Sequence, residues 1–92
     1  MATFIMVGTY SQDAIDDISS QRTENARSTI AAHGGKMLSA YVSLGETDLY
    51  LICEFPDMQS AMKSSIALTK STDISFSTNE CLSAEEFDKL MG

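Results

Sequence analysis

The fold is decided by residues 36–55, KMLSAYVSLGETDLYLICEF. In the first half, every second side chain is apolar, at Leu38, Ala40, Val42 and Leu44. In the second half the alternation resumes with Leu49, Leu51, Cys53 and Phe55. Side chains of a β-strand point to opposite faces in turn, so this period of two predicts strands over residues 36–44 and 48–55. The short glycine-containing link Gly45-Glu46-Thr47 predicts that they form an antiparallel hairpin.

A helix and a strand flank this hairpin on each side. Towards the N-terminus, the apolar residues 3–9 predict a strand buried on both faces, and residues 12–32 are helical in composition. Residues 19–22 interrupt the helical period and offer a second helix start with a serine as N-cap. Gly34-Gly35 ends this helix, because glycine adopts a positive φ without strain.

Towards the C-terminus, Pro56 stops the hairpin and Asp57 is the predicted N-cap of a helix that runs to about residue 70. Residues 74–80 alternate as a fourth strand, and residues 83–86 (SAEE) form a capping box for a short terminal helix. The element order is therefore β-α-β-β-α-β with a helical tail.

This order predicts a single α+β domain of the ferredoxin-like class over residues 1–92. Right-handed crossovers place both long helices on one face of a four-stranded antiparallel sheet, with strand order 4-1-3-2. Beneath the helices we expect the apolar face, Leu38, Val42, Leu49, Leu51, Phe55, Ile74 and Phe76. Met58 and Met62 share a face of the second helix that we also expect in the core.

The opposite face of the sheet has a mixed composition. It carries Ser39, Tyr41, Ser43, Asp48, Tyr50, Ile52, Glu54, Ser75, Ser77 and Asn79. The first strand adds either Phe4 and Met6 or Ile5 and Val7, and both pairs are apolar. A solvent-exposed sheet tolerates this face, but large apolar residues on a central strand favour a cover. A second copy, paired across a two-fold axis, supplies that cover and leaves a pocket beside the small polar residues.

Length and charge limit the classes of function. A chain of 92 residues forms one domain with a small core, for which association with a second copy is a common remedy. Six Lys and Arg against thirteen Asp and Glu give a net charge of -7, so nucleic acid and anionic membrane are disfavoured as partners. With no signal peptide, membrane span or C-x-x-C pair, the sequence predicts a cytoplasmic protein whose Cys53 and Cys81 are reduced.

Several segments resemble the GYD domain family. Residues 41–48 (YVSLGETD) and 54–57 (EFPD) look like the signature region of that family. Arg22 and Gly34-Gly35-Lys36 match its helix-to-strand passage, and Glu85-Glu86-Phe87 is similar to its C-terminal part. The tyrosine of the name-giving Gly-Tyr-Asp is Thr47 here, preceded by Glu46. The resemblance spans nearly the whole chain and implies a dimeric α+β barrel, a group that includes cofactor-free monooxygenases, isomerases and effector-sensing domains.

The residues that are candidates for ligand chemistry are Tyr41, Tyr50, Asp48, Glu54 and Arg22. Glu54 is the candidate catalytic acid or base, and an ion pair with Arg22 or across a dimer is its alternative role. Asp48 is better explained by hydrogen bonds to N–H groups of the hairpin turn. Tyr41 and Tyr50 share a face on neighbouring strands, where phenols either orient a ligand or pack against each other.

No metal site or cofactor motif is evident. His33 is the one histidine and is placed near the C-terminus of the first helix, where a cation is favoured. Neither cysteine has a histidine partner, and Cys53 is expected to be inert core. Gly34-Gly35 follows a helix instead of preceding one, so it cannot cradle phosphate as a P-loop does.

We therefore expect a homodimer or higher oligomer that associates through the open sheet face and binds a small organic molecule, between sheet and helices or across the paired sheets. A cofactor-free enzyme of the proton-transfer, isomerase or monooxygenase type is one alternative. It would use Glu54 or Asp48 as proton acceptor and Tyr41 or Tyr50 as donor. A purely structural or interaction domain is another alternative, and it needs no pocket.

Overall fold

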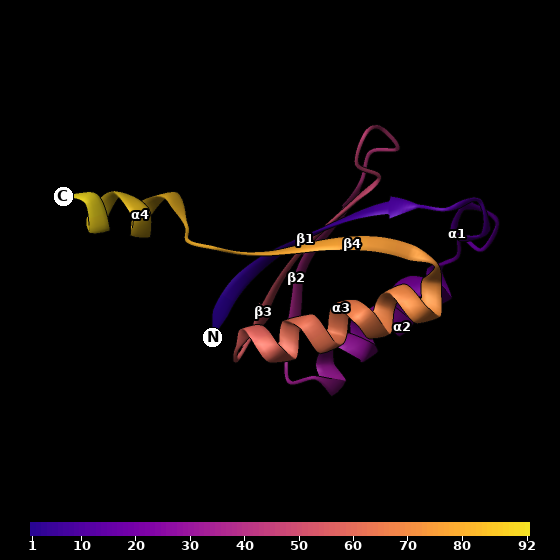
Figure 1. Cartoon of the computed structure of the whole chain (residues 1–92), viewed down its shortest axis with the longest axis horizontal. Coiled ribbons are helices and arrows are strands. Elements are labelled where there is room, and N and C mark those ends of the chain that lie inside the picture. The colour runs from indigo at the N-terminus through magenta and orange to yellow at the C-terminus, as the bar shows by residue number, and fades with distance from the viewer.

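The predicted hairpin forms one side of a four-stranded antiparallel sheet in the computed structural model, which describes all of residues 1–92 (Figure 1). The elements in chain order are β1 (Ala2–Tyr10), α1 (Gln12–Asp16), α2 (Ser20–Ala32), β2 (Lys36–Val42), β3 (Leu49–Phe55), α3 (Met58–Thr72), β4 (Ile74–Cys81) and α4 (Ala84–Met91). The strand order is β2-β3-β1-β4, which reads β4-β1-β3-β2 from the other edge. The predicted α+β class and antiparallel sheet are confirmed.

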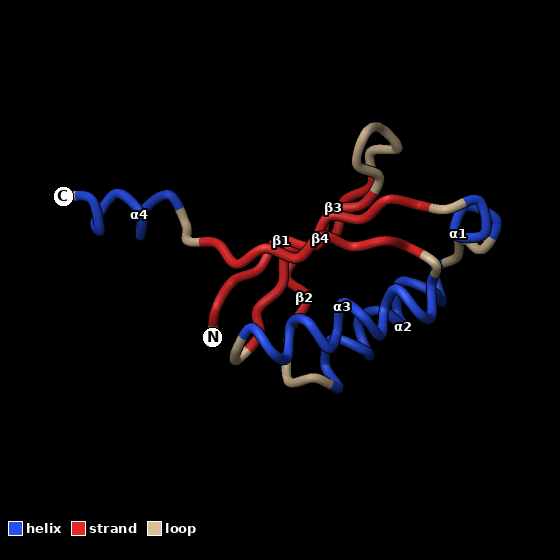
Figure 2. Tube along the Cα trace, viewed as in Figure 1, coloured by secondary structure: helices blue, strands red, loops and turns tan.

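The two long helices, α2 and α3, lie on one face of the sheet, and no element covers the other face (Figure 2). The short helix α1 lies beyond the end of β1, and α4 projects from the end of β4 away from the rest of the molecule (Figure 1). The molecule is consequently elongated, with extents of 48 × 29 × 18 Å. None of the helices combines the length and the hydropathy that crossing a membrane requires.

The core lies between the sheet and the two long helices. Its buried cluster consists of Phe4, Met6, Ile30, Met37, Leu51, Cys53, Phe55, Ala61 and Leu68. At its centre the rings of Phe4 and Phe55 meet edge to face, with centroids 5.7 Å apart. β1 therefore turns Phe4 and Met6 towards the helices and leaves Ile5 partly exposed on the open face. The prediction that this strand is buried on both faces is wrong for the single chain.

A β-bulge in β2 changes which side chains enter the core. Met37 pairs with Cys53 and Ser39 pairs with Ile52, so Leu38 is an extra residue between two paired positions. Met37 is only 5% exposed, whereas Leu38 is 46% exposed. The prediction that Leu38 packs beneath the helices is therefore wrong, because the extra residue shifts the alternation by one position. Beyond the bulge, Ala40 and Val42 are on the helix side of β2 as predicted. Both are exposed, Val42 to 59%, so the predicted burial of Val42 beneath the helices is wrong.

The interruption at residues 19–22 is a true helix boundary. α1 ends at Asp16, and the hydroxyl of the N-cap Ser19 accepts a hydrogen bond from the N–H of Arg22 at 3.0 Å. α3 begins in the same way, because the carboxylate of Asp57 accepts the N–H of Ser60 at 2.7 Å. Hydrogen bonds from Ser60 hold the pKa of Asp57 below its usual value. The capping box of Ser83 and Glu86 at α4 is also confirmed.

The buried stripe of α3 differs from the predicted one. Its buried residues are Ala61, Ser64, Leu68 and Thr72, whereas Met58, Met62 and Ile66 are exposed. The prediction of a core role for Met58 and Met62 is therefore wrong. Large rings from the sheet, Phe4 and Phe55, already fill the space below α3, so small side chains such as Ala61 face it.

The link between β2 and β3 is longer than predicted. It extends over residues 43–48, and the positive φ of 55° falls on Leu44 instead of Gly45. The hydroxyl of Ser43 donates to the carbonyl oxygen of Thr47 at 2.6 Å, which closes the loop. Gly34, with a φ of 78°, terminates α2 as predicted.

Candidate functional site

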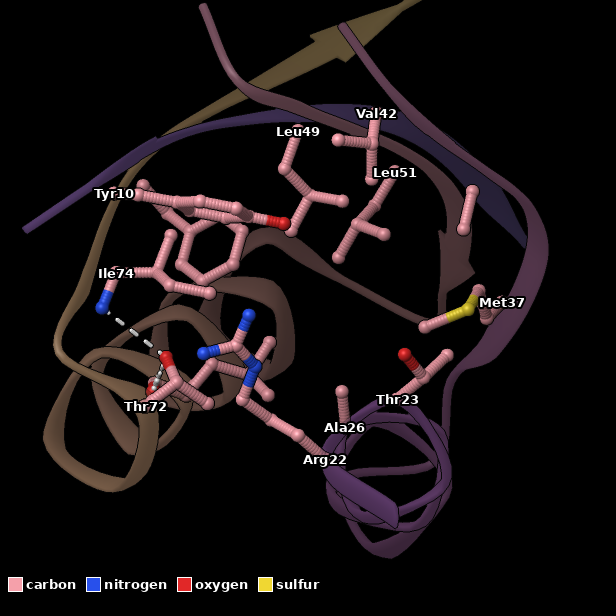
Figure 3. Close-up of a pocket in the computed structure, with 13 residues that line it drawn as sticks. Tyr10, Arg22, Thr23, Ala26, Met37, Val42, Leu49, Leu51, Thr72 and Ile74 are labelled. Carbon is pink, nitrogen blue, oxygen red and sulfur yellow. Dashed lines mark hydrogen bonds between the residues drawn. The ribbon is translucent and has the colours of Figure 1, made fainter. Parts of the chain in front are cut away.

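A cavity of about 210 Å³ lies between the sheet and the paired helices (Figure 3). Ten of its thirteen lining residues are hydrophobic, and they come from all four strands and both long helices. Typical ligand pockets start at about 300 Å³, so this cavity is smaller than most of them. Because a water molecule takes about 30 Å³, the cavity has room for about seven waters or one small organic molecule. It is separate from the open sheet face on which most of the predicted site residues lie.

Small residues at three positions shape this cavity. Ala26 on α2 and Ala40 on β2 leave space between helix and sheet. On β1, a Cβ at Gly8 would lie 2.8 Å from the side chain of Ile74 and 3.3 Å from that of Leu49. Gly8 therefore allows these two side chains to approach each other over the strand, and β1 itself adds no side chain there.

Arg22 is the one charged residue on the cavity wall. It lies in the first turn of α2, and its guanidinium is directed into the cavity beneath the ring of Tyr10 (Figure 3). One guanidinium nitrogen donates to the carbonyl oxygen of Ala14, and the guanidinium carbon is 5.3 Å from the Tyr10 ring centroid. The two ion pairs of the chain join Arg27 to Glu24 and Lys89 to Glu85, so Arg22 has no carboxylate partner.

Tyr10 connects Arg22 to Asp48. The carboxylate of Asp48 accepts the N–H of Tyr10 at 2.8 Å, and the N–H of Asp48 donates to the carbonyl oxygen of Gly8 at 2.9 Å. Asp48 therefore ties the end of β1 to the β2–β3 link. The prediction that Asp48 caps N–H groups of the hairpin turn is wrong, because the N–H that its carboxylate accepts belongs to Tyr10 at the end of β1. The Tyr10 hydroxyl points across the cavity towards Leu49 (Figure 3).

Sequence reasoning missed Tyr10 because it ended the first strand at residue 9. One signal could have found it. Phe4, Met6 and Gly8 share the helix-facing parity, and extending the strand by one residue places Tyr10 on the same face. The cavity therefore depends on a side chain at the last position of a strand, where sequence patterns locate boundaries least well.

The two threonines on the cavity wall differ in their hydrogen bonds. The hydroxyl of Thr72 donates to the carbonyl oxygen of Leu68 at 2.6 Å and accepts the N–H of Ile74 at 3.2 Å. These bonds join the end of α3 to β4 and occupy that hydroxyl. The hydroxyl of Thr23 makes no hydrogen bond within the chain and faces the cavity near Met37 (Figure 3). Thr23 is thus a free polar group for a bound molecule.

Three of the five predicted site residues lie on the open face instead. Tyr41 and Tyr50 are register partners on β2 and β3, so the predicted neighbouring phenols are confirmed. Glu54 lies four residues from Tyr50 on the same strand, about 13 Å away at ~3.3 Å per residue. A carboxylate and a phenol therefore do not converge within one chain. Arg22 is on the other side of the sheet, so the prediction of an ion pair between Arg22 and Glu54 of the same chain is wrong.

The surroundings of the two cysteines and the histidine point to roles in the fold and not in a reactive site. Burial raises the pKa of the Cys53 thiol to about 11, so this thiol stays protonated and unreactive near neutral pH. β1 lies between the strands that carry Cys53 and Cys81, and both thiols are free. Nδ1 of His33 lies 2.9 Å from the carbonyl oxygen of Thr29 at the end of α2. No group of three or more His, Cys, Asp or Glu side chains is arranged to hold a metal ion.

The comparison with known families agrees with the predicted resemblance. The model of the GYD domain family matches residues 4–91, which include every strand and helix of the fold apart from the first two residues of β1. The chain therefore belongs to the GYD domain family. No curated protein and no solved structure matches the chain.

Proposed function

We propose that this GYD domain protein binds a small organic molecule in the cavity between the sheet and helices α2 and α3. The observation that carries the proposal is the cavity itself, with ten hydrophobic lining residues and three polar ones, Arg22, Thr23 and Thr72. That combination is typical of small-molecule sites, in which apolar walls provide affinity and a few polar groups fix orientation. A fully packed domain of this size has no such space, since protein interiors are usually filled to crystal-like density.

We further propose that the working unit is a homodimer, with a ferredoxin-like fold in each chain and a dimeric α+β barrel as the assembly. The open face supports this, because Ile5, Ile52 and Val7 form its centre and no element of the same chain covers them. A second sheet placed against the first would remove these side chains from water. The free thiols of Cys53 and Cys81 favour a reducing compartment such as the cytoplasm.

Helix α4 also supports association with a second copy. It projects from the end of β4, and every residue from 82 to 92 is exposed. Phe87 is 51% exposed and Leu90 is 68% exposed, although both lie on the apolar side of an amphipathic helix. An isolated eight-residue helix is unstable in water, so α4 needs a surface to pack on, and the same chain offers none.

Native mass spectrometry of gently purified, untagged protein tests both parts of the proposal. We expect a dimer or a multiple of it, with added mass from a retained ligand. The matched variant Ala26→Leu fills the cavity from α2 without touching the open face. It should keep the dimer mass and lose the added mass, provided that circular dichroism shows the helices intact.

Each outcome has a distinct meaning. Added mass that persists in Ala26→Leu would place the ligand elsewhere and overturn the cavity proposal. A monomer at micromolar concentration would overturn the dimeric barrel. If no mass is retained, a thermal-shift screen with small metabolites decides, because a ligand at a hundredfold excess over its Kd stabilises the folded state by about 2.7 kcal/mol. A screen without any shift would overturn ligand binding.

A further inference from the structure

The charge on the cavity wall is unbalanced. Arg22 is a permanent cation among ten hydrophobic residues, two threonines and no acid. The chain has thirteen carboxylates and a net charge of -7, yet none of them pairs with this guanidinium. Solvent-exposed cations often lack a partner, but Arg22 is partly buried beneath the Tyr10 ring. A buried or half-buried charge is usually paired, so the missing partner is informative.

The guanidinium keeps most of its donors free. Arginine carries five N–H groups, and the hydrogen bond to the carbonyl oxygen of Ala14 occupies one of the nitrogens. This bond and the cation–π contact with the Tyr10 ring restrict where the guanidinium can lie. A planar fork that is held in one orientation is the side chain best suited to a carboxylate, which it binds through two parallel hydrogen bonds.

The size and charge of the site limit the anion. A phosphate dianion usually needs more than one cation or a nest of backbone N–H groups, and the cavity wall supplies a single Arg. The strongly acidic chain also repels multiply charged anions. A single carboxylate balances Arg22 one to one. The remaining volume, about 210 Å³ with apolar walls, fits a compact aromatic or aliphatic group.

We propose that the ligand class of this cavity is small monocarboxylates with an apolar body, bound with the carboxylate on Arg22 and the apolar part between Leu49, Ala26 and Leu68. The hydroxyls of Tyr10, from β1, and of Thr23, from α2, are additional donors that line the same cavity (Figure 3). This inference rests on the proposed function, since it names the chemistry of a molecule in the same cavity. It adds that the ligand carries a negative charge and that Arg22 recognises it, which the shape of the cavity alone does not provide.

The experiment compares matched acids and amides. Benzoate and hexanoate, with benzamide and hexanamide as neutral partners of the same shape, are titrated into ¹⁵N-labelled protein at pH 7. Dissociation constants come from the chemical shifts of cavity amides such as Ala26 and Leu68. We expect the acids to bind at least tenfold more tightly than the amides, because charge-assisted hydrogen bonds are the stronger kind. In Arg22→Gln this ratio should fall below about threefold.

Two control variants separate recognition from structure. Arg27→Gln removes the same charge from the same helix at an exposed position outside the cavity, so the acid-to-amide ratio should stay unchanged. Arg22→Lys keeps the charge and should keep part of the preference. If Arg22→Gln disturbs the fold, shown by shift changes throughout the spectrum, the ratio in Arg22→Lys and the loss of preference at high salt test the same point.

The outcomes distinguish the two proposals. If neither acids nor amides shift the cavity amides, both the proposed function and this inference are overturned. If acids and amides bind equally, or if the preference persists in Arg22→Gln or falls equally in Arg27→Gln, the cavity binds ligands but Arg22 does not select carboxylates. A preference that depends on Arg22 supports the inference.

Discussion

Gly35 shows how a single missing side chain can be required by packing. A Cβ at this position would lie 2.5 Å from two ring carbons of Phe55 and 2.8 Å from the carbonyl oxygen of Glu54. Phe55 is fully buried against Phe4, so its ring has nowhere to move. The φ of Gly35 is not positive, and the constraint is therefore steric. This differs from Gly34, where the left-handed backbone is the reason for glycine.

We expect Gly35→Ala to lower the free energy of unfolding by about 2–3 kcal/mol, the range typical of overpacked cores. Gly45→Ala is the matched control, because a Cβ there would lie 4.0 Å from its nearest neighbour. That variant should change stability by less than about 1 kcal/mol, and a small gain is expected from the reduced freedom of the unfolded chain. Urea denaturation at one fixed protein concentration measures both. Equal stabilities of the two variants would contradict the steric explanation.

Cys53 makes stability depend on pH in the alkaline range. Burial raises the pKa of its thiol from 9.0 to about 11. Below pH 9 both folded and unfolded states keep the proton, and the thiol contributes no pH dependence. Between pH 9 and 11 the unfolded chain loses the proton first, so the free energy of unfolding falls as the pH rises. The loss at pH 10 should be about 1 kcal/mol, at about 1.4 kcal/mol for each pH unit in this window.

Tyrosines and lysines also titrate in this pH range, so the contribution of Cys53 is measured as a difference between two variants. Urea denaturation of Cys81→Ser at pH 8 and pH 10 is compared with that of the double variant that also carries Cys53→Ala. The first should lose about 1 kcal/mol more than the second over this interval. If both lose the same amount, Cys53 is not protected by burial.

At the scale of the element, α3 is oriented by volume instead of hydropathy. Its larger apolar residues, Met62 and Ile66, face solvent, whereas Ala61, Ser64 and Leu68 face the sheet. The two stripes differ by one residue position, a rotation of about 100° around the helix axis at 3.6 residues per turn. Composition along the helix cannot choose between them, because the choice depends on how much space the sheet leaves. The same argument applies to β2, where the bulge exchanges Met37 and Leu38.

Two truncations on α3 test this orientation. Leu68→Ala removes a fully packed side chain and should lower the free energy of unfolding by about 2–5 kcal/mol. Ile66→Ala removes an aliphatic side chain of similar size from the exposed face and should change it by less than about 0.5 kcal/mol. Both are read from urea denaturation. A large cost for Ile66→Ala would mean that an oligomer buries this face of α3.

At the scale of the whole molecule, one face of the sheet is covered by helices and the other is open. One face and the two long helices enclose the core and the cavity, and the other face has no cover within the chain (Figure 2). A chain of 92 residues has a small core. The apolar area left open on the second face is therefore large compared with the apolar area that the core buries. The proposed dimer would use this area, and α4 would extend the same interface.

A charge placed at the centre of the open face should therefore separate the two chains. Ile52 lies beside Ile5 there, and Ile52→Lys would bring two like charges together across a two-fold axis. We expect light scattering after size exclusion to change from the mass of two chains to that of one. Met62→Lys, on the outer face of α3, is the control and should keep the mass of the parent. A parent protein that is already monomeric would contradict the dimer.

Much of the fold was predictable from residues that act locally. The alternation of β2 and β3, the serine caps at Ser19 and Ser83, and the glycine at the end of α2 each depend on neighbours within a few positions. The pairing of Tyr41 with Tyr50 follows from the same hairpin. Of the predicted site residues, Arg22 lines the cavity and Asp48 supports it through Tyr10, whereas Glu54 and the two tyrosines lie on the opposite face.

By itself, the sequence determined the order and type of the strands and helices, and the sign of the net charge, because propensity, capping and charge belong to short segments. The tertiary structure alone decided which side of α3 and of β2 is buried, and that Tyr10, Arg22 and Gly8 meet at one cavity. These features depend on how side chains that are far apart in sequence fill a shared volume. Close packing is a property of the whole core, and no local pattern encodes it.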